Sequence, residues 1–75
     1  MSIEDLVEGL ATRVVKHSPV QLVLEAKDKD SVRPLMDVLQ RAGYVFVYSD
    51  LTREGWFVYA TPREVLSVKV SFGVP

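Results

Sequence analysis

The sequence predicts an α+β protein: a two-layer α/β sandwich in which two helices cover one face of a four-stranded mixed sheet. Three observations support this prediction. Apolar residues recur at helical spacing in two segments, apolar and polar residues alternate in two others, and an aromatic hairpin pattern lies between residues 44 and 60. The expected order of elements is α-β-α-β-β-β, within a single domain of residues 1–75.

The first predicted helix begins at Ser2 and ends before Pro19. Ser2 and the acidic residues after it form a capping-box pattern, with negative charge where the helix dipole favours it. Gly9 lies inside this helix and is expected to cost about 1 kcal/mol relative to alanine. The expected apolar face consists of residues at helical spacing, namely Ile3, Leu6, Val7, Leu10 and Val14.

A strand is predicted over Val20–Ala26, because its alternate residues form one apolar face and one partly polar face. A second helix follows, capped by Asp30 or Ser31 and ending near Ala42. Gly43 then occupies the position after a helix end that glycine favours. The apolar stripe of this helix consists of Val32, Leu35, Met36, Leu39 and Ala42.

The segment of residues 44–60 contains six of the seven aromatic residues of the chain. Two runs of β-branched and aromatic residues, Tyr44–Tyr48 and Trp56–Ala60, flank a polar segment that ends in Gly55. This arrangement is typical of a β-hairpin. A loop of this length does not fix the register of the two strands by itself.

The two faces of the hairpin depend on that register. If Tyr48 pairs with Trp56, these two residues share one face with Tyr44, Phe46 and Val58. The other face then consists of Val45, Val47, Phe57 and Tyr59. Both faces are apolar in either register, and helices on one side of a sheet can cover only one of them. We therefore expect a partner, a ligand or a second layer on the uncovered face.

A final strand is predicted over Val65–Phe72, because four apolar residues alternate with polar residues there. A short turn after Ala60 separates it from the hairpin. If the strand at Val20–Ala26 and the first hairpin strand are parallel, the second helix joins them by a right-handed crossover.

The composition excludes several classes of protein. A net charge of −1 argues against strong non-specific binding of nucleic acid or of anionic membranes. The chain has no cysteine, which excludes disulfides, thiolate metal sites and thiol nucleophiles. The acidic N-terminus does not resemble a signal peptide and no apolar run approaches a membrane span, so we expect a cytoplasmic location. The lack of asparagine favours a thermophilic source.

No catalytic motif is present in the sequence. His17 is the only histidine and has no fixed carboxylate partner in the sequence, so a structural role at a helix end is favoured. Asp28 and Asp30 flank a lysine in a predicted polar turn. Helix capping explains Asp30, and capping and solvation are favoured for the pair over acid–base work or cation binding. We therefore predict that the protein is not an enzyme and has no catalytic residue, metal site or cofactor.

Four segments of the chain resemble the TusA/SirA-like family of small sulfur-carrier proteins. They are Leu24–Asp28, with its Ala-x-Asp-like turn, Ser31-Val32 at a helix cap, Gly43-Tyr44 at the helix end, and Gly55–Tyr59 in an antiparallel hairpin. The resemblance covers roughly residues 2–60. It implies a two-layer α/β sandwich.

The chain departs from this family at the reactive site. The family's Cys-Pro-x-Pro motif is replaced by Ser2-Ile-Glu-Asp5, and serine cannot substitute for a persulfide-forming thiolate. The family's first strand would precede Met1. One hypothesis is that Val65–Phe72 takes the place of that strand, as in a circular permutation.

The favoured function is that of a non-enzymatic interaction domain, which self-associates or docks a protein partner through an aromatic sheet face. Tyrosine and tryptophan dominate the energetics of many interfaces. The expected partner-binding residues are Tyr44, Tyr48, Trp56 and Arg53.

Two alternatives remain open. The segment Arg53–Tyr59 resembles the aromatic RNA-binding strand of the RRM family, so nucleic-acid binding through the hairpin is the first. Glu54, the order of elements and the negative net charge depart from that family. The second alternative is a small ligand bound between the second helix and the hairpin.

Overall fold

The computed structural model describes residues 2–64, which form two helices and a four-stranded antiparallel sheet. This confirms the α+β class, but the order of elements is α-β-β-α-β-β and the sheet is not mixed. The predicted final strand, Val65–Phe72, lies outside the described residues, as does the permutation hypothesis based on it. The elements are α1 (Ile3–Leu6), β1 (Ala11–His17), β2 (Leu22–Ala26), α2 (Lys29–Arg41), β3 (Tyr44–Thr52) and β4 (Gly55–Pro62).

The prediction of one long helix from Ser2 to Pro19 is wrong. Helix α1 is a single turn that Ser2 caps, and Gly9 adopts φ +82° in the turn that follows. This left-handed conformation is available to glycine at little cost. It lies two residues beyond the C-cap Val7, in the turn that separates α1 from β1. Residues 11–17 include three β-branched side chains, which favour a strand over a helix. The apolar residues at helical spacing from Ile3 to Leu10 therefore belong to α1 and to the turn that ends at Leu10, and β1 begins at Ala11.

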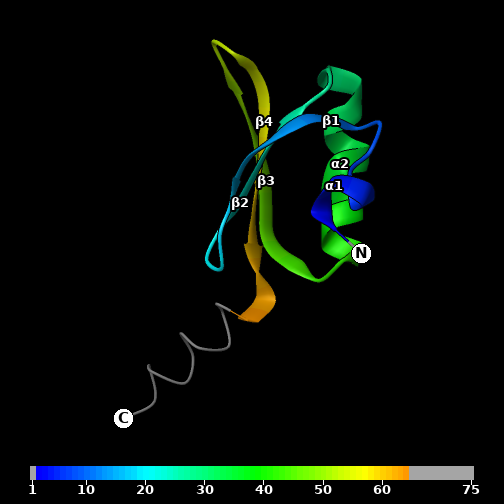
Figure 1. The fold of residues 1–75 in the computed structure, drawn as a ribbon. Helices are drawn as coiled ribbons and strands as arrows, with labels where there is room; N and C mark the ends of the chain where they lie inside the picture. Colours follow the sequence, from blue (N-terminus) through cyan, green and yellow to red (C-terminus); the bar gives the residue numbers. More distant parts are fainter. Residues whose placement is uncertain (1, 65–75) are drawn as a thin grey trace.

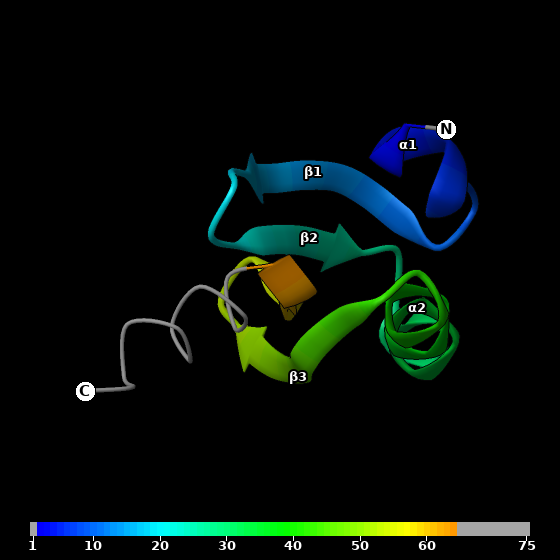
Figure 2. The same ribbon diagram turned by 90° about the horizontal axis from the view of Figure 1, so that it is seen from below.

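The strands lie side by side in the order β1-β2-β4-β3 (Figures 1 and 2). Every neighbouring pair is antiparallel, so β2 and β3 run in the same direction with β4 inserted between them. Helix α2 connects β2 to β3, which makes this part of the chain a split β-α-β unit. Among the strands described for residues 2–64, the two outer ones are β1 and β3.

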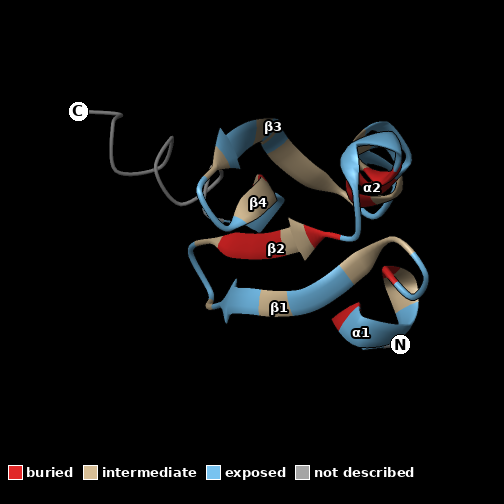
Figure 3. Cartoon of the chain, turned by 90° about the horizontal axis from the view of Figure 1, so that it is seen from above, coloured by how far each residue is buried: buried red, intermediate tan, exposed pale blue. Residues whose placement is uncertain are grey.

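Both helices lie on one side of the sheet, as predicted, and the core fills the space between them and the sheet (Figure 1). Strand β2 is the most buried strand (Figure 3). None of the helices between residues 2 and 64 has the length and the apolar character needed to cross a bilayer. The fully buried side chains of the core are Leu22, Leu24, Leu35, Leu39 and Val58.

The N-cap of helix α2 lies two residues before Asp30, the first of the two predicted caps. The Asp28 carboxylate accepts hydrogen bonds of 2.9 Å from both the backbone nitrogen and the hydroxyl of Ser31. Asp28, rather than Asp30 or Ser31, is therefore the N-cap. The predicted glycine after the helix is confirmed, since Gly43 has φ +99° directly after the C-cap Ala42.

The hairpin is longer and its turn is shorter than the sequence pattern indicated. Thr52 pairs with Gly55, so only Arg53 and Glu54 lie in the turn. The Thr52 hydroxyl accepts a hydrogen bond from the Glu54 backbone nitrogen and donates one to the Gly55 carbonyl. These bonds fix the turn, and a two-residue turn fixes the register of the strands.

Candidate functional site

The register divides the predicted partner-binding residues between the two faces of the sheet. Tyr48 pairs with Tyr59, and Trp56 pairs with Leu51, so the assumed pairing of Tyr48 with Trp56 does not occur. Trp56 and Tyr44 pack against the core on the helix side. Tyr48 lies on the opposite side, which we call the open face. Arg53, the fourth predicted residue, is in the hairpin turn.

Two aromatic side chains stack on each other at the centre of the open face. Tyr48 stacks on Tyr59 with ring centroids 4.9 Å apart and an interplanar angle of 12°. Val23 and Phe57, which flank Tyr59 on β2 and β4, are buried although both described helices lie on the other side of the sheet. The uncovered apolar surface that the sequence predicted is therefore not at the centre of this face.

The exposed apolar side chains concentrate instead on the outer strand β3. Phe46 is 66% exposed, Leu51 is 61% exposed and Tyr48 is 53% exposed. We call the outer side of β3, with these three side chains, the β3 edge. An outer strand also presents backbone N–H and C=O groups that no neighbouring strand satisfies. Among residues 2–64, the β3 edge thus combines apolar side chains with backbone hydrogen-bonding groups that no other described strand pairs with.

Phe46 has a strained backbone. Its φ is +51°, and it is the only residue other than glycine with positive φ among residues 2–64. Two residues of β3, Phe46 and Val47, lie opposite the single residue Ala60 of β4. The extra residue in β3 forms a β-bulge. A left-handed conformation at a bulky residue costs on the order of 1–3 kcal/mol. The bulge lets Val47 pack against the core and leaves the Phe46 ring in solvent.

The other outer strand, β1, is better protected against pairing with another chain than β3, which has a single bulge. Its register shifts twice, and it carries Arg13, Lys16 and His17 along seven residues. Bulges and basic side chains are devices by which proteins protect sheet edges. Arg13 also forms an ion pair of 2.7 Å with Glu25 on β2. Asp50, in contrast, is the only charged residue in the nine residues of β3.

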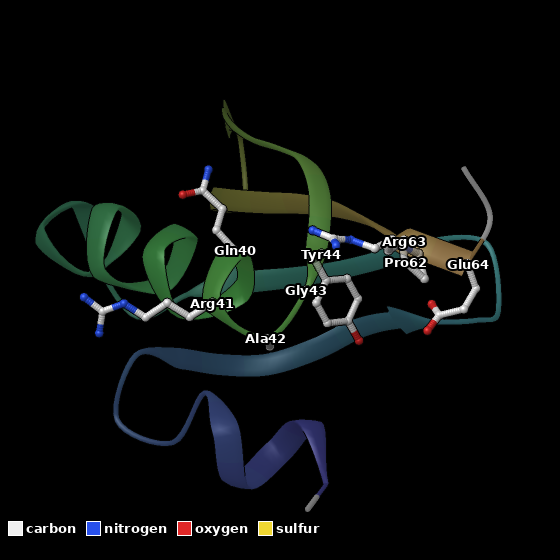
Figure 4. Close-up of a pocket in the computed structure, with 8 residues that line it drawn as sticks. All are labelled: Gln40, Arg41, Ala42, Gly43, Tyr44, Pro62, Arg63 and Glu64. Atoms are coloured by element: carbon white, nitrogen blue, oxygen red, sulfur yellow. The ribbon is translucent and has the colours of Figure 1, made fainter. Parts of the chain in front are cut away.

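Two adjacent hollows lie where α2 ends and the hairpin begins. One has a volume of about 420 Å³ and is lined by residues 40–44 and 62–64 (Figure 4). The other, of about 450 Å³, includes Ser2, Ile3 and His17. Tyr44 and Ala42 line both. Among residues 2–64 no three histidine or carboxylate side chains are grouped so that they could hold a metal ion.

Partial burial, and secondarily the charge of Glu64, raise the pKa of Tyr44 above its usual 10.0. As pH rises through 10, Tyr44 ionises more readily in the unfolded chain than in the folded one, so this group lowers stability at alkaline pH. When the pH is raised from neutral to above 10, we expect the melting temperature of Tyr44→Phe to fall by less than that of the wild type. Equal losses in thermal melts would contradict this assignment.

Of the three exposed side chains on the β3 edge, only Tyr48 was predicted from the sequence to bind a partner, whereas Phe46 and Leu51 were not. Leu51 lies in a polar segment that was expected to be a loop, and only the two-residue turn places it in a strand. Phe46 was one of six aromatic residues, and no sequence signal indicates its positive φ. A bulge position normally filled by glycine can be recognised only once the register is known.

Comparisons of the chain with models of protein families, with curated proteins and with solved structures find no match.

Proposed function

We propose that this protein is a non-enzymatic interaction domain that self-associates through the β3 edge. The observation that supports this most strongly is Phe46, which is exposed and held at a strained φ. A strained, solvent-exposed aromatic side chain lowers the stability of the isolated fold. Such residues persist where they have a function, and an exposed ring on an outer strand is suited to binding another protein surface.

The occupant that fits this edge is a second copy of the chain. Asp50 is its single charge, so the edge has no run of charge that would select an oppositely charged partner. The net charge of −1 also opposes the approach of two copies only weakly. An outer strand can always pair with its own copy, because an antiparallel arrangement satisfies a two-fold axis.

The size of the edge predicts a reversible complex. Nine residues of strand span about 30 Å. One sheet with its side chains is about 10 Å thick, since stacked sheets pack about 10 Å apart. This strip is smaller than the roughly 800 Å² per partner that stable complexes bury. We therefore expect a dimer that dissociates on dilution, which sedimentation equilibrium can measure.

The experiment compares Leu51→Lys with Val20→Lys. Leu51 is on the β3 edge. Val20 is 58% exposed and lies on the connection between β1 and β2, away from β3 in the strand order. Lysine on an outer strand blocks pairing, so we expect Leu51→Lys to weaken dimerisation at least about tenfold, or about 1.4 kcal/mol. Val20→Lys should dimerise like the wild type. A monomeric wild type, or equal behaviour of the two variants, would contradict the proposal.

Nucleic-acid binding is the alternative that the same experiment can include. Tyr48 is exposed on the open face, where an aromatic ring could stack on a base. Its ring already stacks on Tyr59, however, and Arg13 on this face is paired with Glu25. A mobility shift with single-stranded RNA at low salt that Tyr48→Ala abolishes would favour this alternative over self-association.

A further inference from the structure

We infer that two copies join into one continuous antiparallel sheet, in which β3 pairs with β3 of the other copy and Ser49 lies on the two-fold axis. This inference rests on the proposed self-association and specifies its register. Each copy contributes the four strands described for residues 2–64, with β3 at the outer side. The joined sheet would have β1 of each copy at its two ends, and β1 is the strand that is protected against further pairing.

Symmetry limits the possible registers to a few. In an antiparallel pair related by a two-fold axis, the residue on the axis faces itself, and residues equally far before and after it face each other. The register is therefore defined by the residue on the axis. The regular part of β3 runs from the end of the bulge, at Val47, to Thr52 before the turn.

Three of the alternatives are unfavourable. An axis at Asp50 would place two carboxylates directly opposite each other, and like charges in that position are destabilising. An axis at Tyr48 would bring the strained Phe46 of the bulge into the new ladder, opposite Asp50. An axis at Leu51 would leave only residues 50–52 to pair before the two turns meet.

An axis at Ser49 avoids all three problems. It pairs residues 47–51, which are free of the bulge's positive φ and of the turn. On the helix side, Leu51 would face Val47 of the other copy and lose much of its 61% exposure. On the open face, Tyr48 would face Asp50, so that a phenol rather than a carboxylate lies opposite each charge. Phe46 would lie at the border of the interface, opposite Thr52.

The test is disulfide cross-linking of single-cysteine variants, since the chain has no cysteine of its own. Directly opposed residues of antiparallel strands have Cα atoms about 4.5–5.5 Å apart, which lies within the range that a disulfide spans. We expect Ser49→Cys to form a covalent dimer on mild oxidation, with loss of most of the monomer on a non-reducing gel. Leu51→Cys is the matched control, because its two thiols would be too far apart.

The outcomes separate this inference from the proposed function. If sedimentation shows a dimer but Leu51→Cys cross-links more than Ser49→Cys, the register is wrong and self-association stands. If the wild type is a monomer at every concentration, both are overturned. Circular dichroism of the reduced variants checks that each one is folded before oxidation.

Discussion

Replacing Phe46 by glycine is expected to stabilise the isolated protein and to weaken its self-association. Glycine adopts φ +51° without the steric cost that phenylalanine has, and the Phe46 ring contributes little packing because it is 66% exposed. Relief of the strain is worth about 1 kcal/mol, at the lower end of the usual range. For a chain of this size that corresponds to a rise in melting temperature of roughly 4–8 °C.

The control for this prediction is Phe46→Ala. Alanine removes the ring but keeps a β-carbon, so it should weaken dimerisation without raising the melting temperature of the monomer. Thermal melts at low protein concentration measure the stability, and sedimentation equilibrium measures the association. A lower melting temperature for Phe46→Gly than for Phe46→Ala would show that Phe46 is not strained in the folded protein.

Replacing Leu24 by alanine should have the largest effect on stability of any change considered. Leu24 is completely buried on β2, between β1 and β4 and beneath the helices. Removing its methyl groups leaves a cavity and costs about 2–5 kcal/mol. A protein of this length has a total stability of roughly 4–11 kcal/mol, so this substitution alone brings it near the unfolding threshold. Urea denaturation followed by circular dichroism measures the loss.

Leu51→Ala is the matched change at an exposed site. The same atoms are removed, but Leu51 is largely in solvent, so the free energy of unfolding should change by no more than about 0.5 kcal/mol. Its effect should be on dimerisation instead. If Leu51→Ala were as destabilising as Leu24→Ala, the leucine would be part of the core rather than of an interaction surface.

The parts of the fold that could be predicted are those in which local pattern and tertiary packing agree. The stripe that includes Leu35 and Leu39 on α2 became the buried face of that helix, and Gly43 ends it as expected. The alternation in β2 placed Leu22 and Leu24 in the core. In these segments a single periodicity predicts the secondary structure and the residues that face the helices.

The failures come from segments in which two signals compete. Residues 3–14 have helical spacing, but β-branched side chains and the left-handed conformation of Gly9 convert the second half into β1. Residues 49–52 are mostly polar because they lie on an outer strand, and this made them resemble a loop. That error displaced the register, and with it the assignment of Tyr48 and Trp56 to one face.

The same error explains how the candidate site changed. The aromatic residues were expected to form one uncovered face, yet Tyr44 and Trp56 pack on the core and Phe57 is buried. The exposed apolar surface is the β3 edge, which can be recognised only when the strand order is known. Strand order depends on contacts between distant segments, which local periodicity does not specify.

Amide hydrogen exchange of β3 at low and high protein concentration tests pairing of the β3 edge most directly. Backbone N–H groups that point outward from β3 exchange readily in a monomer and are protected when a second strand pairs with them. If β3 pairs between two copies, protection within residues 47–51 increases with protein concentration while protection in β1 does not. Concentration-independent exchange throughout β3, or an increase confined to β1, would contradict it.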